Sequence, residues 1–170
     1  EIALFLTGKQ DCLIANIRFN KELDISVVSP VERLMETTGG EMHSSLYKRI
    51  DELIEKHKTT LIFTNTRSAT ERVIHHLKEM FPKKYMENIG AHHSSLSKEH
   101  RFSIEERLRK GELKVVVTST SLELGIDIGF VDLVILLGSP KGVARSLQRI
   151  GRSGHRLHDT PKGRFLVLDR

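Results

Sequence analysis

The segment LKVVVTS (113–119) decides the fold class. It places three valines in a row and follows them at once with hydroxyl side chains. Such a run of β-branched residues is typical of a strand that is buried on both faces of a sheet. Similar runs occur at TTLIFT (59–64), VDLVILLG (131–138) and GRFLVLD (163–169). We therefore expect at least four buried strands.

Helical patterns alternate with these strands. One helix is expected from about Ser68 to Pro82, with Ser68 and Glu71 forming its capping box. A second is expected over 96–111, and a short third over 141–150. The alternation of strand and helix predicts an α/β fold with a parallel sheet, covered by helices on both faces in three layers.

The first 58 residues follow a different pattern. EIALFLTGKQ (1–10) predicts the end of a helix, and DCLIANIRF (11–19) and LDISVVSP (23–30) predict two strands. TTGGEMH (37–43) is typical of a flexible loop, and SSLYKRIDELIEKHK (44–58) of a helix. Because the chain begins within one element and ends directly after another, we expect a fragment of a longer protein. Residues 1–22 are then the tail of a preceding domain or a linker, and residues 23–170 form the domain itself.

The composition, 38% hydrophobic and 29% charged, is that of a soluble globular chain. Apolar runs such as LVILL (133–137) are too short to span a membrane, and no signal peptide is visible. We therefore expect no membrane partner. Cys12 is the only cysteine, which fits a reducing compartment and a cytoplasmic location. The histidine pairs at 75–76 and 92–93 are adjacent in sequence, so we expect no metal site.

The positive charge is concentrated at one end. Residues 141–170 carry eight Lys or Arg and two Asp or Glu, whereas the rest of the chain has a net charge of −1. This asymmetry fits an anionic partner that docks at one place, and it also fits a solvated basic end.

Polar loops follow the predicted strands, where ligands of parallel sheets gather. One loop holds Thr64, Asn65, Thr66 and Arg67, and another contains Ser94. A third begins at Thr118 and Ser119 and leads to Gly125 and Asp127. Hydroxyl, amide and guanidinium donors ahead of a helix suit phosphate groups. Read more simply, the serines and threonines cap helices and Asp127 stabilises a loop.

The segment QRIGRSGHR (148–156) combines arginines with glycines. In the helix before it, Lys141, Arg145 and Arg149 form a basic stripe, and Val143, Leu147 and Ile150 are expected to form a buried one. Gly151 should end the helix, so that Arg152 lies on a turn, and Gly154 should bend the chain again. The turn presents arginines to a phosphate, or it is a basic helix end that the helix dipole favours.

Taken in order, IFTNTRSATE, HHSSLS, STSLELGIDIG and QRIGRSGHR resemble the C-terminal RecA-like domain of superfamily 2 ATP-dependent helicases. The likeness covers about residues 25–170 and is strongest for the Lhr (large helicase-related) branch. LIFTNTR is similar to motif IV of these helicases, TSTSLELGIDI to motif V and QRIGRSGHR to motif VI. EIALFLTGK is similar to the segment that closes their first RecA-like domain.

The resemblance implies half of an ATP site. In these helicases ATP lies between two RecA-like domains, and single-stranded nucleic acid crosses both. The first domain supplies the phosphate loop and the acidic motif that holds Mg²⁺. This chain has no G-x-x-x-x-G-K-[ST] sequence, so it is not expected to hydrolyse ATP alone. Its implied partner is the first RecA-like domain of the same protein.

The resemblance also implies roles for single residues. Arg152 matches an arginine finger, a cation that neutralises the transferring phosphoryl group, and Gln148 lies by the same phosphate. Asp127 lies near the ribose, where Gly125 allows close approach. A second finger is expected where this chain has His155 followed by Arg156, so either residue takes that place.

A further set of residues matches the loops that hold the sugar-phosphate backbone. They are Thr64, Asn65, Thr66, Arg67, Ser94, Thr118 and Ser119. The Lhr likeness implies DNA as the partner, with RNA as the alternative, and a role in DNA repair. Two hypotheses follow: the second motor domain of an ATP-dependent helicase, or a helicase-derived module that binds nucleic acid or protein without hydrolysis.

Overall fold

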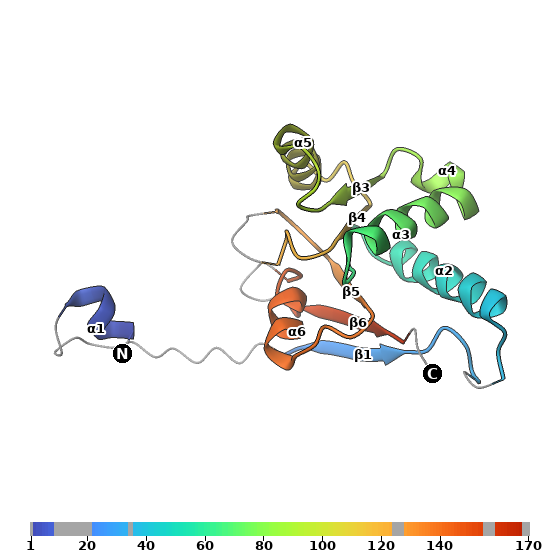
Figure 1. Cartoon of the computed structure of the whole chain (residues 1–170), viewed down its shortest axis with the longest axis horizontal. Coiled ribbons are helices and arrows are strands. Elements are labelled where there is room, and N and C mark those ends of the chain that lie inside the picture. Colours follow the sequence, from blue (N-terminus) through green and yellow to red (C-terminus); the bar gives the residue numbers. More distant parts are fainter. Residues whose placement is uncertain (1, 9–21, 34–35, 124–127, 155–158, 168–170) are drawn as a thin grey trace.

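The computed structural model describes residues 2–8, 22–33, 36–123, 128–154 and 159–167. Its centre is a six-stranded sheet in which every neighbouring pair is parallel, with the order β1-β6-β5-β2-β4-β3 (Figure 1). The strands are β1 (Asp24–Val28), β2 (Thr60–Phe63), β3 (Ile89–His92), β4 (Val115–Thr118), β5 (Leu133–Leu137) and β6 (Lys162–Leu166). The predicted parallel α/β sheet is confirmed.

Each central strand contributes to a hydrophobic core on both of its faces. In β2, Ile62 packs into one core while Leu61 and Phe63 pack into the other. Successive side chains of β4 and β5 divide between the two cores in the same way. A strand that alternates between two buried faces must be apolar throughout, which explains the unbroken valine run of the sequence.

Helices cover both faces of the sheet and complete the three layers. On one face lie α2 (Gly39–Glu55), α3 (Arg67–Met80) and the short α4 (Pro82–Tyr85), grouped together in Figure 1. On the other lie α5 (Lys98–Arg109) and α6 (Val143–Ile150). Helix α1 (Ile2–Thr7) precedes these elements in the chain, as the first residues predict. The strand predicted over 11–19 lies outside the described residues.

One predicted helix start and one predicted helix cap are wrong. The supposed loop at 37–43 contains the first turn of α2, because Thr38 and Glu41 form a capping box: the Thr38 hydroxyl accepts from the Glu41 amide, and the Glu41 carboxylate accepts from the Thr38 amide. Helix α3 begins at Arg67, within one residue of the predicted start, but Ser68 and Glu71 do not form its cap. Its cap is Thr66, whose hydroxyl accepts a hydrogen bond of 3.1 Å from the Ala69 amide. The predicted cap at Ser97 of α5 is confirmed.

Two elements escaped prediction. Strand β3 has the sequence IGAH, which is too short and too poor in β-branched residues to be recognised. Its Gly90 packs against α5, since a Cβ atom there would lie 2.8 Å from Ile104 Cδ1. Helix α4 is a single turn with proline at its start.

Candidate functional site

Because all six strands are parallel, the loops that follow them meet at one edge of the sheet. The loops after β5, β2, β4 and β3 are neighbours there, in that order. These loops, with Thr118 at the end of β4 and Arg67 at the start of α3, contain every described residue that the sequence predicts to bind nucleic acid. The candidate site is therefore built on the rigid ends of four adjacent strands.

Thr64 joins two of these loops from inside. Its side chain is buried, its amide donates to the Thr118 carbonyl at 2.8 Å, and its hydroxyl lies 2.8 Å from the Thr70 hydroxyl. Thr118 and Ser119 are buried as well. These three residues thus fix the shape of the loops, and any contact of theirs with nucleic acid stays a prediction.

The other predicted contacts are exposed. Asn65, Thr66, Arg67 and Ser94 all face solvent. The Asn65 side-chain amide donates to the Ser139 carbonyl at 3.1 Å, which ties the loop after β2 to the loop after β5. The Arg67 guanidinium donates to the Ser95 hydroxyl in the loop after β3. Both side chains are therefore held in place before any ligand binds.

A buried histidine connects three elements beside this edge. His92, the last residue of β3, is 1% exposed. Its Nε2 lies 2.8 Å from Glu105 Oε1 on α5, and its Nδ1 lies 2.6 Å from Ser121 Oγ in the loop after β4. The neighbouring His93 pairs with Glu71 on α3 at 2.6 Å. The sequence shows only that the two histidines are adjacent. Their hydrogen-bond partners could not be predicted from it, because they come from three distant segments.

We expect this histidine to make the free energy of unfolding depend on pH. Burial lowers the pKa of His92 below its usual 6.5, although the hydrogen bond to Glu105 acts in the opposite direction. As the pH falls below 6.5, the unfolded chain binds a proton that the folded chain still excludes, so the folded state loses stability. We expect the free energy of unfolding to fall less steeply below pH 6.5 in His92→Gln than in the unsubstituted chain.

The measurement is urea unfolding at a series of pH values between 7.5 and about 5, the range in which histidine commonly titrates. His75→Gln is the matched control, because His75 is 73% exposed. It should leave the slope unchanged. Equal slopes for His92→Gln and the unsubstituted chain would show that His92 is not the titrating group.

Helix α6 presents a different face to the sheet from the one predicted. Arg149 is 2% exposed, whereas Val143 is 77% exposed and Leu147 is 45% exposed. The expected buried stripe is therefore wrong for Val143 and Leu147 and right for Ile150. The basic stripe is wrong for Arg149.

Two buried partners explain why Arg149 faces inward. Its guanidinium lies 3.2 Å from Glu123 Oε2 and 5.0 Å from the centre of the Phe63 ring. Glu123 is itself buried, and its other oxygen accepts from Arg145 Nε at 2.9 Å. One carboxylate in the loop after β4 thus binds two arginines of α6. Hydrophobic spacing within the helix cannot reveal a partner that lies 26 residues away.

The turn after α6 is closely fixed. The Arg152 amide donates to the Arg149 carbonyl at 3.0 Å, and Arg152 is half-buried. Ser153 is fully buried, and its hydroxyl accepts from the Lys162 amide at 2.9 Å. Gly154 has φ of +67°, and a Cβ atom there would lie 2.9 Å from the Pro161 nitrogen. The predicted bend at Gly154 is confirmed, and the turn is tied to β6.

The remaining predicted nucleotide contacts are only partly described. Gln148 is exposed on the last turn of α6. Gly125, Asp127 and Arg156 lie outside the described residues. In the described part of the chain, no group of three or more His, Cys, Asp or Glu side chains is placed to hold a metal ion. No helix among the described residues is long and apolar enough to cross a bilayer.

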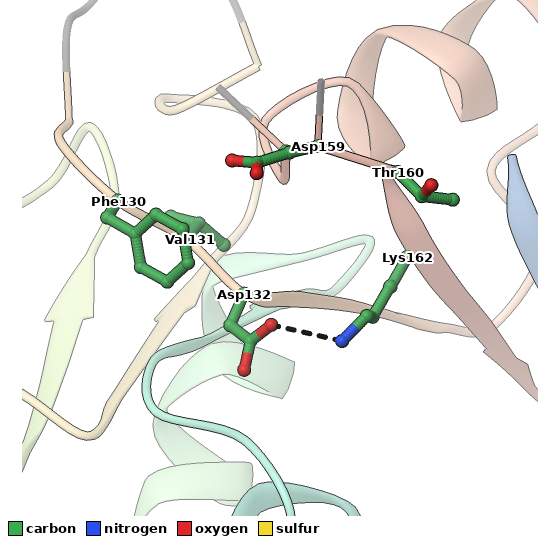
Figure 2. A pocket seen from close by; sticks show the side chains of 7 residues that line it. Phe130, Val131, Asp132, Asp159, Thr160 and Lys162 are labelled. Atoms are coloured by element: carbon green, nitrogen blue, oxygen red, sulfur yellow. Dashed lines mark hydrogen bonds and ion pairs between the residues drawn. The ribbon is translucent and has the colours of Figure 1, made fainter. Parts of the chain in front are cut away.

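A pocket of about 220 Å³ lies away from these loops. Figure 2 shows Asp132 and Lys162 in its wall, joined by an ion pair of 3.3 Å. Burial raises the pKa of Asp132, but hydrogen bonds from the Lys58 amide and the Lys162 ammonium outweigh it and hold that pKa below its usual value. Asp132 and Lys162 stand where β5 and β6 begin. The pocket is therefore at the opposite edge of the sheet from the candidate site.

Known sequences resemble the chain strongly. The sequence model of the family described as "Helicase conserved C-terminal domain" matches residues 45–156. Two proteins named ATP-dependent helicase Lhr-Core, from Methanocaldococcus jannaschii and Methanothermobacter thermautotrophicus, are 56% and 55% identical over the whole chain. The chain spans only 20% of the length of each relative. The resemblance to Lhr helicases is thereby confirmed.

Solved structures agree. The Mycobacterium smegmatis helicase Lhr bound to ssDNA and AMP-PNP has a TM-score of 0.86 and 36% identity, covering 97% of this chain and 22% of that one. The DUF1998 helicase MrfA bound to DNA and AMPPNP has a TM-score of 0.76 and 26% identity, covering 98% of this chain and 23% of its own. The RecA-like fold is therefore confirmed.

Proposed function

Because the chain belongs to the helicase conserved C-terminal domain family, we propose that it is the second motor domain of an ATP-dependent nucleic-acid helicase. The observation that carries this proposal is the placement of two sets of residues on one rigid body. Asn65, Thr66 and Arg67 lie on the loop edge, and Arg152 lies on the turn after α6. A motor domain needs a surface that binds the nucleic-acid strand and an arginine that reaches the phosphates of ATP. We propose these residues for the two roles.

The nucleotide side consists of cations and polar groups. Arg152 would act as the arginine finger, and Gln148 would contact the same phosphate. Gly125, Asp127 and Arg156 complete the proposed ATP contacts. When bound, ATP supplies the phosphoryl group whose transfer releases free energy. We propose that Mg²⁺ is held by a first RecA-like domain.

The nucleic-acid side consists of exposed donors at the start of α3. Asn65, Arg67 and Ser94 would bind the sugar-phosphate backbone, with the amino end of α3 favouring negative charge. Thr64, Thr118 and Ser119 would hold these loops in shape and offer backbone amides. Such contacts grip a single strand of any sequence. We propose DNA as the strand, since both solved relatives contain DNA, and RNA as the alternative.

The two sides are joined by the buried contacts of the loop after β4. Thr64 bonds to Thr118 at the end of β4, and Glu123, five residues further along the chain, holds Arg149. Arg149 precedes the finger by three residues. If binding of the nucleic-acid strand shifts the loop after β4, the turn that carries Arg152 would therefore move with it. This coupling is how hydrolysis would become movement along the strand.

The non-hydrolysing alternative has less support. It explains the basic end as a purely electrostatic surface, yet Arg149 of that end is buried and paired with Glu123, so its charge is not part of such a surface. The Lhr resemblance further leads us to propose a role in DNA repair and a location in the cytoplasm.

The proposal is tested by ATP hydrolysis in two samples. We expect the full-length protein to hydrolyse ATP faster when single-stranded DNA is added. The 170-residue chain alone should show no turnover above the buffer rate, because it lacks a phosphate loop. An intact protein that binds strands without hydrolysing ATP would instead support the non-hydrolysing module.

A further inference from the structure

Lys141 adopts an unusual backbone conformation. Its φ is +59°, and it is the only residue other than glycine with a positive φ in the described part of the chain. This left-handed region is strained for a residue with a Cβ atom and free of strain for glycine. Strained residues of this kind cluster at ligand sites, where the surrounding structure holds them.

Neighbouring contacts fix the loop that carries Lys141. The Asn65 side chain donates to the Ser139 carbonyl at 3.1 Å, and the Lys141 amide donates to the Ser139 hydroxyl at 3.3 Å. The Ser146 hydroxyl donates to the Gly142 carbonyl at 2.7 Å, which secures the start of α6. Ser139 thus connects Lys141 to Asn65, which is predicted to contact the nucleic-acid strand.

The charge of Lys141 is also distinctive. Arg145 and Arg149 follow it at intervals of four residues, and both form ion pairs with Glu123. The exposed ammonium of Lys141 makes no ion pair with any residue that the structure describes. It is the one member of the predicted basic stripe whose charge is not balanced in this way.

We propose that Lys141 binds a phosphodiester group of the nucleic-acid strand. This inference rests on the proposed function and adds a site to it. The nucleic-acid strand would run along the edge of the sheet where these loops meet. It would pass from Arg67 by Asn65 to Lys141 in the loop after β5. The strained backbone would then hold a lysine, where glycine would be free of strain, close to the nucleic-acid strand.

The test compares Lys141→Gly, Lys141→Arg and a control in the full-length protein. Binding to single-stranded DNA is measured at several salt concentrations without nucleotide. One lost phosphate contact should weaken binding several-fold at low salt and reduce the slope of log K against log salt by about 0.7. Lys141→Arg should keep the slope. The control, Lys48→Ala, changes an exposed lysine on α2 and should behave like the unsubstituted protein.

Thermal unfolding separates binding from folding. Because glycine adopts φ of +59° without strain, the melting temperature of Lys141→Gly should be equal or higher while its affinity falls. An unchanged salt slope in Lys141→Gly would overturn this inference alone. A raised KM for ATP with unchanged strand affinity would also overturn it, by assigning Lys141 to nucleotide phosphates. Absence of strand binding in the unsubstituted protein would overturn the proposed function as well.

Discussion

Replacing Arg152 with alanine in the full-length protein is expected to reduce strand-stimulated ATP hydrolysis by about 10³-fold or more. The guanidinium would neutralise charge that develops on the transferred phosphoryl group, and alanine leaves that charge uncompensated. The turn that carries Arg152 is held by Ser153 and Gly154 against β6, so the substitution should leave its course unchanged. Turnover is measured at saturating ATP and saturating single-stranded DNA.

Binding of single-stranded DNA provides the internal control for this experiment. Arg152→Ala should bind single-stranded DNA nearly as tightly as the unsubstituted protein, because the exposed loop residues are untouched. Arg49→Ala is the matched arginine control, since Arg49 forms an exposed ion pair with Glu52 on α2. If turnover of Arg152→Ala is unchanged, Arg152 is not the finger. If strand binding falls instead, the segment 148–156 is a backbone-binding surface.

Replacing Glu123 with leucine is expected to lower the free energy of unfolding by about 3–5 kcal/mol. The carboxylate is buried and is the ion-pair partner of Arg149, which is equally buried. Without it, a guanidinium stays in a low-dielectric environment beside the face of Phe63, with no other described carboxylate paired to it. Urea unfolding of the chain measures the loss.

A second substitution identifies the cause of this loss. Arg149→Met in the Glu123→Leu background removes the unpaired charge, so it should restore much of the stability. Glu36→Ala, which breaks an exposed ion pair with Arg33, should cost less than about 1 kcal/mol. If the double variant instead loses as much free energy of unfolding as Glu123→Leu and Arg149→Met lose in sum, then lost packing, and not a buried unpaired charge, explains the effect.

The sequence predicts the sheet well because a buried parallel strand has a local signature. Val115 to Val117 and the LVILL run need no knowledge of their neighbours to be recognised as strands. The same holds for the cap at Ser97, whose signal lies within four residues. Strand β3 lacks such a local signature, because its sequence IGAH includes a glycine that packs closely against α5.

The site is predicted less completely because its key contacts are not local. The loop residues Asn65 and Arg67 are visible as polar side chains after a strand. The orientation of α6 is not visible, since Glu123 and Phe63 reach Arg149 from other loops and strands. His92 likewise takes its partners from α5 and the loop after β4. In both places, contacts with residues distant in the sequence decide which side chains are buried, and the local sequence pattern does not.

The pairing of β1 with β6 has a consequence for synthesis. Asp24 is the register partner of Lys162, so about 140 residues separate the two strands in the chain. At roughly 5–20 residues per second, β1 leaves the ribosome many seconds before β6 exists to cover its inner edge. Ile25 and Val27 remain partly exposed even after folding. The nascent chain therefore presents an unpaired strand while these residues are being made, and this is the interval in which chaperone binding would protect it.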